Sequence, residues 1–184
     1  MPAVPAKTGW KTSDLVYIAL FAVLIAVCSW IAVPAAVPFT LQTFAVFLAE
    51  GLLGGKRGTL AVLVYVLLGA VGIPVFAGFG AGIGVLLGPT GGYLLGFLLS
   101  ALIYWLVTAG LGTRLPVRIG AMALGLMVCY TFGTAWFMVV YVRTSGPISF
   151  VTALSWCVFP FLLPDCVKLA LAVTLSGRLA RHIR

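Results

Sequence analysis

Long stretches without a charged residue constrain the fold of this chain more than any other feature. Residues 15–49, 58–113 and 119–142 contain no Asp, Glu, Lys or Arg. Over the whole sequence 63% of residues are hydrophobic and only 8% are charged, with a mean hydropathy of +1.24. A soluble domain carries roughly 25% charged residues, so a surface of this composition belongs in a lipid bilayer. We therefore expect an all-α membrane protein with one integral membrane domain over residues 1–184.

Proline, glycine and charged residues divide the apolar sequence into six expected transmembrane helices. They cover about residues 15–33, 41–53, 60–71, 93–111, 119–142 and 164–182. The last helix is expected to begin near Pro164, because proline is best tolerated in the first turn of a helix. Residues 149–159 would form a short capping helix before it. Residues 34–40 and 72–92 are then loops at one face of the membrane.

The distribution of Lys and Arg predicts the orientation of these helices. With a cytoplasmic N-terminus, the inner segments carry most of the basic residues: Lys7, Lys11, Lys56, Arg57, Arg114, Arg118, Arg178, Arg181 and Arg184. The outer loops carry only Arg143. Basic residues accumulate on the cytoplasmic side of membrane proteins, so we expect both termini inside and the 34–40 and 72–92 loops outside. The same distribution explains the formal charge of +8 without nucleic acid as a partner.

Two charged residues interrupt the last expected helix. Asp165 and Lys168 lie three residues apart in "FLLPDCVKLALA", although a charge near the bilayer centre costs ~2.5–3.5 kcal/mol. A helix that starts near Pro164 places both close to the outer surface and on one face. Ionisable residues within membrane spans indicate a functional site, so we expect the pair to bind a small polar ligand. The alternative is a local ion pair that only neutralises itself.

Two outer loops add polar groups near this pair. One is "AVPFTLQTF" (36–44), at the start of the second helix, and the other is the glycine-rich "GFGAGIGVLLGPTGGY" (78–93). Their polar side chains are Thr40, Gln42, Thr43, Thr90 and Tyr93. Those of the first loop could also be ordinary helix-capping residues. Non-helical backbone at membrane depth is tolerated where it is buried in protein or lines a cavity, so both loops are candidates for the wall of a substrate cavity.

The sequence contains no motif for catalysis, metal binding or nucleotide binding. "GLLGGKRGT" (51–59) lacks the GxxxxGK[ST] spacing of a phosphate-binding loop, and the cytoplasmic bias of positive charge explains Lys56 and Arg57. The four cysteines have no metal-ligand spacing, and the only histidine, His182, lies in the basic tail. We therefore expect no catalytic residue, no metal and no cofactor.

The first helix carries a pair of small residues at helical spacing. Ala22 and Ala26 lie four residues apart, which lets another helix approach closely. That helix could belong to this chain or to a partner.

Three segments together resemble one protein family. "VPFTLQTFAVFLAEGLLGGKRG", "YVLLGAVGIPVFAGFGAGIGVLLGPTGGYLLGF" and "LPDCVKLALA" are similar to the BioY family, the biotin-specific substrate-binding (S) components of energy-coupling factor (ECF) transporters. The resemblance extends from about Leu15 to His182, and residues 111–160 match only in hydropathy. It implies the S-component fold, with six helices, cytoplasmic termini, and a substrate cavity that is open to the outside and roofed by the loops after the first and third helices.

The resemblance also implies roles for individual residues. Asp165 and Lys168 match the polar pair of the family's last helix, and Ala22 and Ala26 match the alanine motif through which such components dock on the transmembrane coupling (T) subunit. The implied substrate-binding residues are Asp165, Lys168, Thr40, Gln42, Gly88, Thr90, Gly91 and Tyr93. Residues 76–84 offer no polar side chain here, so any contact from them comes from backbone groups or aromatic packing.

The function that the resemblance implies is high-affinity biotin binding and uptake, as the substrate-specificity subunit of an ATP-driven transporter in the plasma membrane. The implied partners are biotin, a T subunit and two ATPase subunits. The alternative is a self-contained, proton-coupled secondary transporter of a small vitamin-like molecule, with Asp165 as the proton-linked carboxylate. The sequence lacks a broken-helix pair repeated in two halves, which argues against this alternative.

Overall fold

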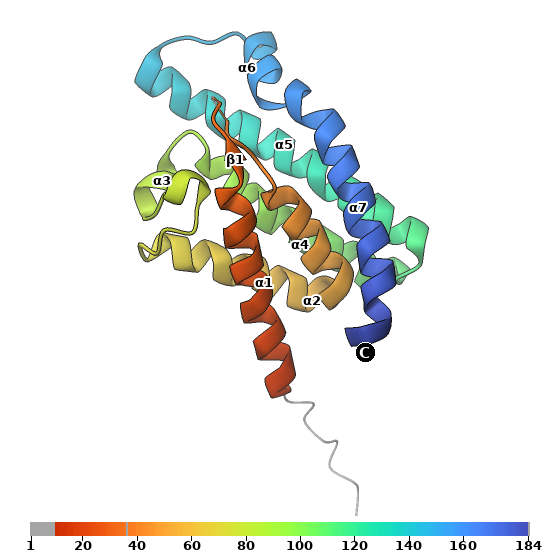
Figure 1. The fold of residues 1–184 in the computed structure, drawn as a ribbon. Helices are drawn as coiled ribbons and strands as arrows, with labels where there is room; N and C mark the ends of the chain where they lie inside the picture. The colour runs from red at the N-terminus through yellow and green to blue at the C-terminus, as the bar shows by residue number, and fades with distance from the viewer. Residues whose placement is uncertain (1–9, 36, 184) are drawn as a thin grey trace, which may run out of the picture.

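The structure is a computed structural model that describes residues 10–35 and 37–183 (Figure 1). Almost all of its regular structure is helical, which confirms the predicted fold class. The elements in chain order are α1 (Thr12–Trp30), β1 (Ala32–Val33), β2 (Phe39–Thr40), α2 (Gln42–Ala70), the 3₁₀ turn η1 (Ala77–Phe79), α3 (Ile83–Leu87), α4 (Gly91–Leu111), α5 (Leu115–Ser145), α6 (Phe150–Cys157) and α7 (Phe159–Ile183).

Five helical segments among the described residues are long and apolar enough to cross a membrane. They are Thr12–Trp30, Gln42–Ala70, Gly91–Leu111, Leu115–Ser145 and Phe150–Ala180. Less than half of the most apolar window of each is buried inside the protein, so the remaining apolar surface is left for lipid. The chain is thus a multi-pass membrane protein.

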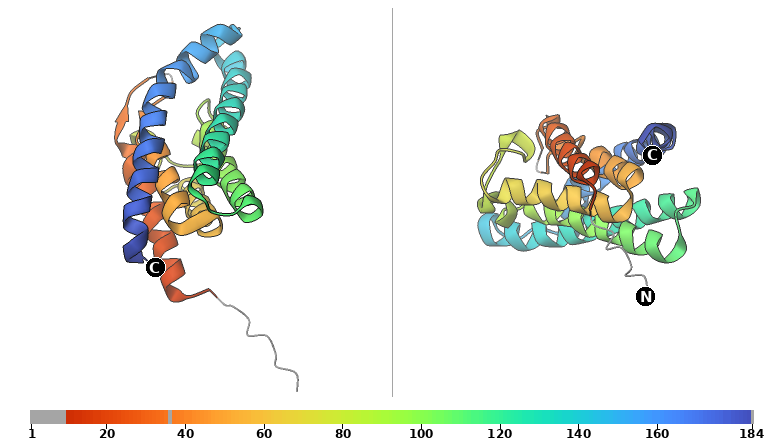
Figure 2. Two further views of the ribbon diagram at one scale, coloured as in Figure 1. Left: turned by 90° about the vertical axis from the view of Figure 1, so that its right-hand side faces the viewer. Right: turned by 90° about the horizontal axis from the view of Figure 1, so that it is seen from below.

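Helix α2 contains both the second and the third expected helices, joined at a single residue. Gly54 has φ +79° within otherwise helical backbone, a conformation that glycine adopts without steric cost. The chain changes direction there, as Figures 1 and 2 show. The expected linker over residues 54–59 is therefore helical from Gly55 onward, because one left-handed glycine is enough to make the turn.

The last helix begins before its expected start. Helix α7 starts at Phe159, so that Pro164 lies inside the helix. The preference of proline for a first helical turn is met by Pro160 instead. Pro164 removes one backbone donor, which membrane helices tolerate where neighbouring groups compensate. The preceding helix α6 begins after Ser149, whose hydroxyl accepts a hydrogen bond from the backbone N–H of Thr152 at 3.2 Å.

The loop after α1 is short because it forms a two-stranded hairpin. Strands β1 and β2 pair antiparallel, with Ala32 opposite Thr40 and Val33 opposite Phe39. This hairpin lies at one end of the molecule together with α3 and α6, whereas the start of α1 and the end of α7 lie at the other end (Figures 1 and 2). Both described chain ends therefore lie on the same side of the molecule.

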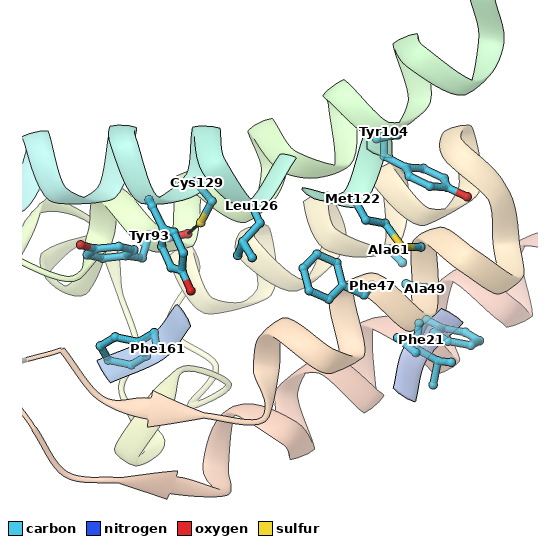
Figure 3. Close-up of a cluster of buried hydrophobic side chains, with 14 of the residues drawn as sticks. Phe21, Phe47, Ala49, Ala61, Tyr93, Tyr104, Met122, Leu126, Cys129 and Phe161 are labelled. Atoms are coloured by element: carbon cyan, nitrogen blue, oxygen red, sulfur yellow. Dashed lines mark hydrogen bonds between the residues drawn. The ribbon is translucent and has the colours of Figure 1, made fainter. Parts of the chain in front are cut away.

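The buried core lies between α2, α4, α5 and α7. Figure 3 shows Phe47, Met122, Leu126, Cys129 and Tyr93 in one continuous cluster. Leu126, Cys129 and Tyr93 also line a cavity at the hairpin end of the molecule. The apolar core thus continues directly into the cavity wall.

Candidate functional site

A cavity of about 110 Å³ lies at the hairpin end of the molecule. This is several times the roughly 10–15 Å³ that one water molecule occupies on the same scale, so the space suits a larger ligand. Its polar lining includes most of the side chains expected from the sequence: Thr40, Gln42, Thr43, Thr90, Tyr93, Asp165 and Lys168. The two loops and the last helix therefore converge on one space.

The charged pair of α7 is buried in this cavity. Lys168 Nζ lies 2.8 Å from Asp165 Oδ1, and the two residues are 5% and 2% exposed. The hydroxyl of Tyr130 on α5 donates to Asp165 Oδ2 at 2.5 Å. Both carboxylate oxygens are therefore bonded, each from a different direction, and the carboxylate is held in a fixed orientation.

Tyr130 was not among the expected site residues. It lies in the uncharged stretch 119–142. The sequence marks it only as a tyrosine within a membrane span, whose hydroxyl needs a hydrogen-bond partner when it is buried. Which side of α5 faces α7 depends on the tertiary packing, so the pairing with Asp165 could not be read from the sequence.

The ammonium group of Lys168 connects the last helix to the hairpin. It donates to the backbone carbonyl of Thr40 at 2.7 Å and lies 4.1 Å from the centroid of the Phe39 ring. An ammonium group has three protons, so two are used within the protein and one remains for a ligand. The position of β2 above the cavity thus depends on the charge of Lys168.

Gln42 supplies a donor without a partner. Its Nε2 is buried and lines the cavity, and no described residue accepts a hydrogen bond from it. Buried donors without partners are rare in native proteins, so this amide suits a ligand acceptor. Thr40 is different, because its hydroxyl accepts a hydrogen bond from the backbone N–H of Gln42 at 3.2 Å. The Thr40 hydroxyl is therefore engaged locally at the start of α2, although the N-cap residue of that helix is Leu41.

The glycine-rich loop contributes an apolar wall and few free polar groups. The hydroxyl of Tyr93 is hydrogen-bonded to that of Thr134 at 2.9 Å, so Tyr93 offers mainly its ring. Gly88 and Gly91 are outside the cavity lining. The carbonyl of Gly88 accepts a hydrogen bond from the indole N–H of Trp136 at 3.0 Å, which fixes the loop against α5. These two glycines shape the loop rather than contact the space.

Ala22 and Ala26 pack inside the chain. They are 1% and 4% exposed and belong to a buried cluster that includes Ala45 and Val46 of α2. The small pair therefore serves the close approach of α1 to α2, which is one of the two interpretations left open by the sequence. A partner could reach these alanines only if α1 separates from α2.

Together these features define a membrane protein with a small-molecule site. One wall carries a buried ion pair, a free amide donor and a free ammonium proton, and the others are apolar and aromatic. Sites of this kind orient a ligand through a few polar groups and bind it by burial of its apolar parts.

The chain belongs to the BioY family, whose family model matches residues 4–184. It is 43% identical over 170 residues to a protein of Pyrococcus horikoshii named "Probable biotin transporter BioY", with 92% of this chain and 97% of that protein covered. It is 42% identical over 171 residues to the "Biotin transporter BioY" of Thermotoga maritima, with 91% and 96% covered.

A solved structure shares the fold. It is described as the "S-component for biotin from an ECF-type ABC transporter", and it superposes with a TM-score of 0.81 at 26% sequence identity. The match covers 97% of this chain and 95% of the other. The fold of this chain is therefore that of an ECF S-component.

Proposed function

We propose that this chain binds biotin with high affinity and serves as the substrate-specificity (S) subunit of an ATP-driven ECF transporter for biotin uptake. The observation that carries the proposal is the buried Asp165–Lys168 pair in a cavity at the hairpin end of the molecule, opposite the described chain ends (Figure 1). Relatives of this chain are named as biotin transporters, and a solved structure with the same fold is described as an S-component for biotin.

The chemistry of biotin fits the groups in the cavity. Biotin has a rigid ureido-thiophane bicycle, an apolar chain and one carboxylate. Asp165 can accept from a ureido N–H, while Lys168 can donate to the ureido oxygen or pair with the carboxylate. The free Nε2 of Gln42 is a further donor. A ligand that leaves such groups unpaired loses ~1–3 kcal/mol for each, so the polar groups provide selectivity.

The apolar lining supplies most of the affinity in this proposal. Phe76, Tyr93, Leu126 and Phe161 face the cavity from four different elements or loops. Burial of apolar surface contributes about 25 cal/mol per Å², so the bicycle and the chain of biotin gain free energy along this wall. The polar groups at Thr40 and Asp165 then fix which way the ligand lies.

Uptake in this proposal needs other subunits in the plasma membrane. A T subunit and two ATPase subunits would supply the energy, with ATP hydrolysed in the latter. Docking on the T subunit through Ala22 and Ala26 remains a prediction, and their burial against α2 limits it to an arrangement in which α1 shifts. The chain itself is then a binding subunit and not an enzyme.

The proposal is tested by measuring biotin binding to the purified full-length protein. Asp165→Asn or Lys168→Ala leaves the other member of the pair buried without its partner, and each should weaken binding at least about tenfold, or ~1.4 kcal/mol. Cys166→Ser is the matched control, because Cys166 lies between them on the exposed side of α7. Wild-type affinity in both pair variants would contradict the site assignment, and no biotin binding by the unaltered protein would contradict the function.

A further inference from the structure

A second cavity lies at the opposite end of the molecule from the biotin site. It measures about 680 Å³ and lies between the start of α1, the bend of α2, the junction of α4 with α5, and the end of α7. The cavity is lined by one carboxylate, that of Asp14, and by four cationic side chains. The four are Lys11, Lys56, Arg57 and Arg118. Residues 51–57, part of the segment that lacks the spacing of a phosphate-binding loop, thus form one wall of a basic cavity.

Most of this positive charge has no counter-charge in the protein. Arg57 pairs with Asp14 at 3.1 Å. Among the side chains that the structure describes, no carboxylate lies within ion-pair distance of Lys11, Lys56 or Arg118. Lys11, Lys56 and Arg118 therefore share the cavity with Asp14 but have no carboxylate partner of their own, and this excess of positive charge favours the entry of an anion.

Arg118 is held in place by the protein while part of its guanidinium stays free. Its Nη2 donates to the carbonyl of Gly51 at 2.8 Å and to the hydroxyl of Ser176 at 3.0 Å, and its Nε donates to the hydroxyl of Tyr104 at 3.3 Å. No described residue accepts from Nη1. A fixed, planar guanidinium with free donors is suited to a phosphate or carboxylate group.

Lys56 is positioned by an aromatic ring at the mouth of the same cavity. Its Nζ lies 4.6 Å from the centroid of the Trp10 ring, and Trp10 also lines the cavity. The Lys56 ammonium is therefore kept near the hollow by a cation–π contact that leaves its protons available.

We propose that this cavity binds the phosphate group of an anionic phospholipid in the cytoplasmic leaflet. It lies on the side of the molecule where α1 begins and α7 ends (Figure 1), which the distribution of Lys and Arg assigns to the cytoplasm. Next to it, α1 and α7 leave Leu15, Leu175 and Leu179 exposed. An acyl chain would cover these leucines, whereas an acidic peptide would not, so the surroundings favour a lipid.

Lipid retention by the full-length protein tests the proposal without reference to biotin. Native mass spectrometry after incubation with short-chain phosphatidylglycerol should show a retained lipid, and phosphatidylcholine should be retained at least about tenfold less. Lys56→Gln combined with Arg118→Gln should lower phosphatidylglycerol affinity about tenfold, which corresponds to ~1.4 kcal/mol. The matched control is Arg114→Gln with Arg178→Gln, which removes the same charge from exposed arginines outside the cavity lining and should stay within about twofold of the unaltered protein.

A second variant and a second ligand complete the experiment. Because Arg118 also binds protein groups, Lys11→Gln with Lys56→Gln provides a second variant that leaves Arg118 in place and should also weaken lipid binding. Equal phosphatidylglycerol retention in cavity and control variants would overturn the proposal. It would also fail if inorganic phosphate bound as tightly as the lipid, since the site would then serve a free anion. If the cavity variants retained the lipid normally but no longer co-purified with other transporter subunits, the cavity would bind a protein partner and the lipid proposal would be wrong.

Discussion

The Asp165–Lys168 pair is a buried ion pair whose charges are matched within the protein before any ligand enters. Tyr130 and Lys168 occupy the two carboxylate oxygens, and the carbonyl of Thr40 takes a further ammonium proton. Removing one partner of such a pair is costly, ~3–5 kcal/mol, because the other charge stays buried. The pair therefore presents ordered polar groups to the cavity and needs no rearrangement to do so.

Replacing Tyr130 tests this ordering at the level of one hydroxyl. Tyr130→Phe keeps the ring but removes the donor to Asp165 Oδ2. A lost hydrogen bond to a charged group costs ~1.5–3 kcal/mol, so biotin affinity, measured by isothermal titration calorimetry, should fall by about tenfold or more. Tyr141→Phe is a control on the same helix, because Tyr141 is outside the cavity lining. Unchanged affinity of Tyr130→Phe would show that Asp165 is oriented without it.

At the scale of elements, the roof of the cavity is held by a close contact between α2 and the loop that follows it. Phe76 is 1% exposed and lines the cavity. Its ring lies directly over Gly69, where an added Cβ would come within 2.0 Å of Phe76 Cζ. Only glycine permits this contact, so packing on Gly69 helps to position the loop over residues 72–82. The hydroxyl of Ser29 and the indole N–H of Trp30 also donate to the loop carbonyls of Val75 and Pro74, at 2.6 Å and 3.0 Å.

The Gly69 contact gives a prediction about this loop. Gly69→Ala should push Phe76 out of its position, lower the thermal stability by ~1–3 kcal/mol and weaken biotin binding. Gly84→Ala is the matched control, because a Cβ at Gly84 meets nothing within 4 Å. Normal binding and normal unfolding temperature of Gly69→Ala would contradict a role for this contact.

A second prediction concerns the small residues of α1. Leucine at both Ala22 and Ala26 overpacks the contact with α2, so the isolated subunit should unfold at a lower temperature, by ~1–3 kcal/mol. Ala19→Leu should have little effect, since Ala19 is exposed on the same helix. If the double variant keeps its stability and instead fails to co-purify with a T subunit, the pair serves docking.

The elements also show which features of the sequence carried structural information. Charge-free stretches predicted an all-α membrane fold, and the spacing of Asp165 and Lys168 predicted one shared face. The Lys and Arg distribution predicted which side of the molecule faces the cytoplasm, and that orientation stays a prediction. The ends of the helices were harder to predict from the sequence. Gly54 by itself makes the turn within α2, and Pro164 lies inside α7 and does not begin it. These outcomes depend on neighbouring helices that compensate local costs, as does the pairing of Tyr130 with Asp165. Local sequence does not contain that information.

At the scale of the whole molecule, the hairpin and the described chain ends lie at opposite ends of the helical bundle (Figures 1 and 2). The ligand cavity is lined by residues at the hairpin end, among them Val37, Pro38 and Thr40. The core between the cavity and the chain ends is filled by Phe47, Met122 and Tyr104, each at most 2% exposed (Figure 3). A ligand bound near Asp165 therefore has no open path through the molecule. Release on the other side therefore requires the protein to move.

Uptake into proteoliposomes tests whether other subunits must drive this movement. The chain alone should bind biotin but show no uptake driven by a proton gradient, because the filled core leaves the bound ligand no path across the molecule. Adding a T subunit and two ATPase subunits should give uptake that depends on ATP hydrolysis, measured as accumulation of labelled biotin. Asp165→Asn should abolish uptake in the complex through lost binding. Proton-driven accumulation by the chain alone, eliminated by Asp165→Asn, would instead establish a self-contained secondary transporter, because no other subunit would then be needed to move the ligand past the filled core.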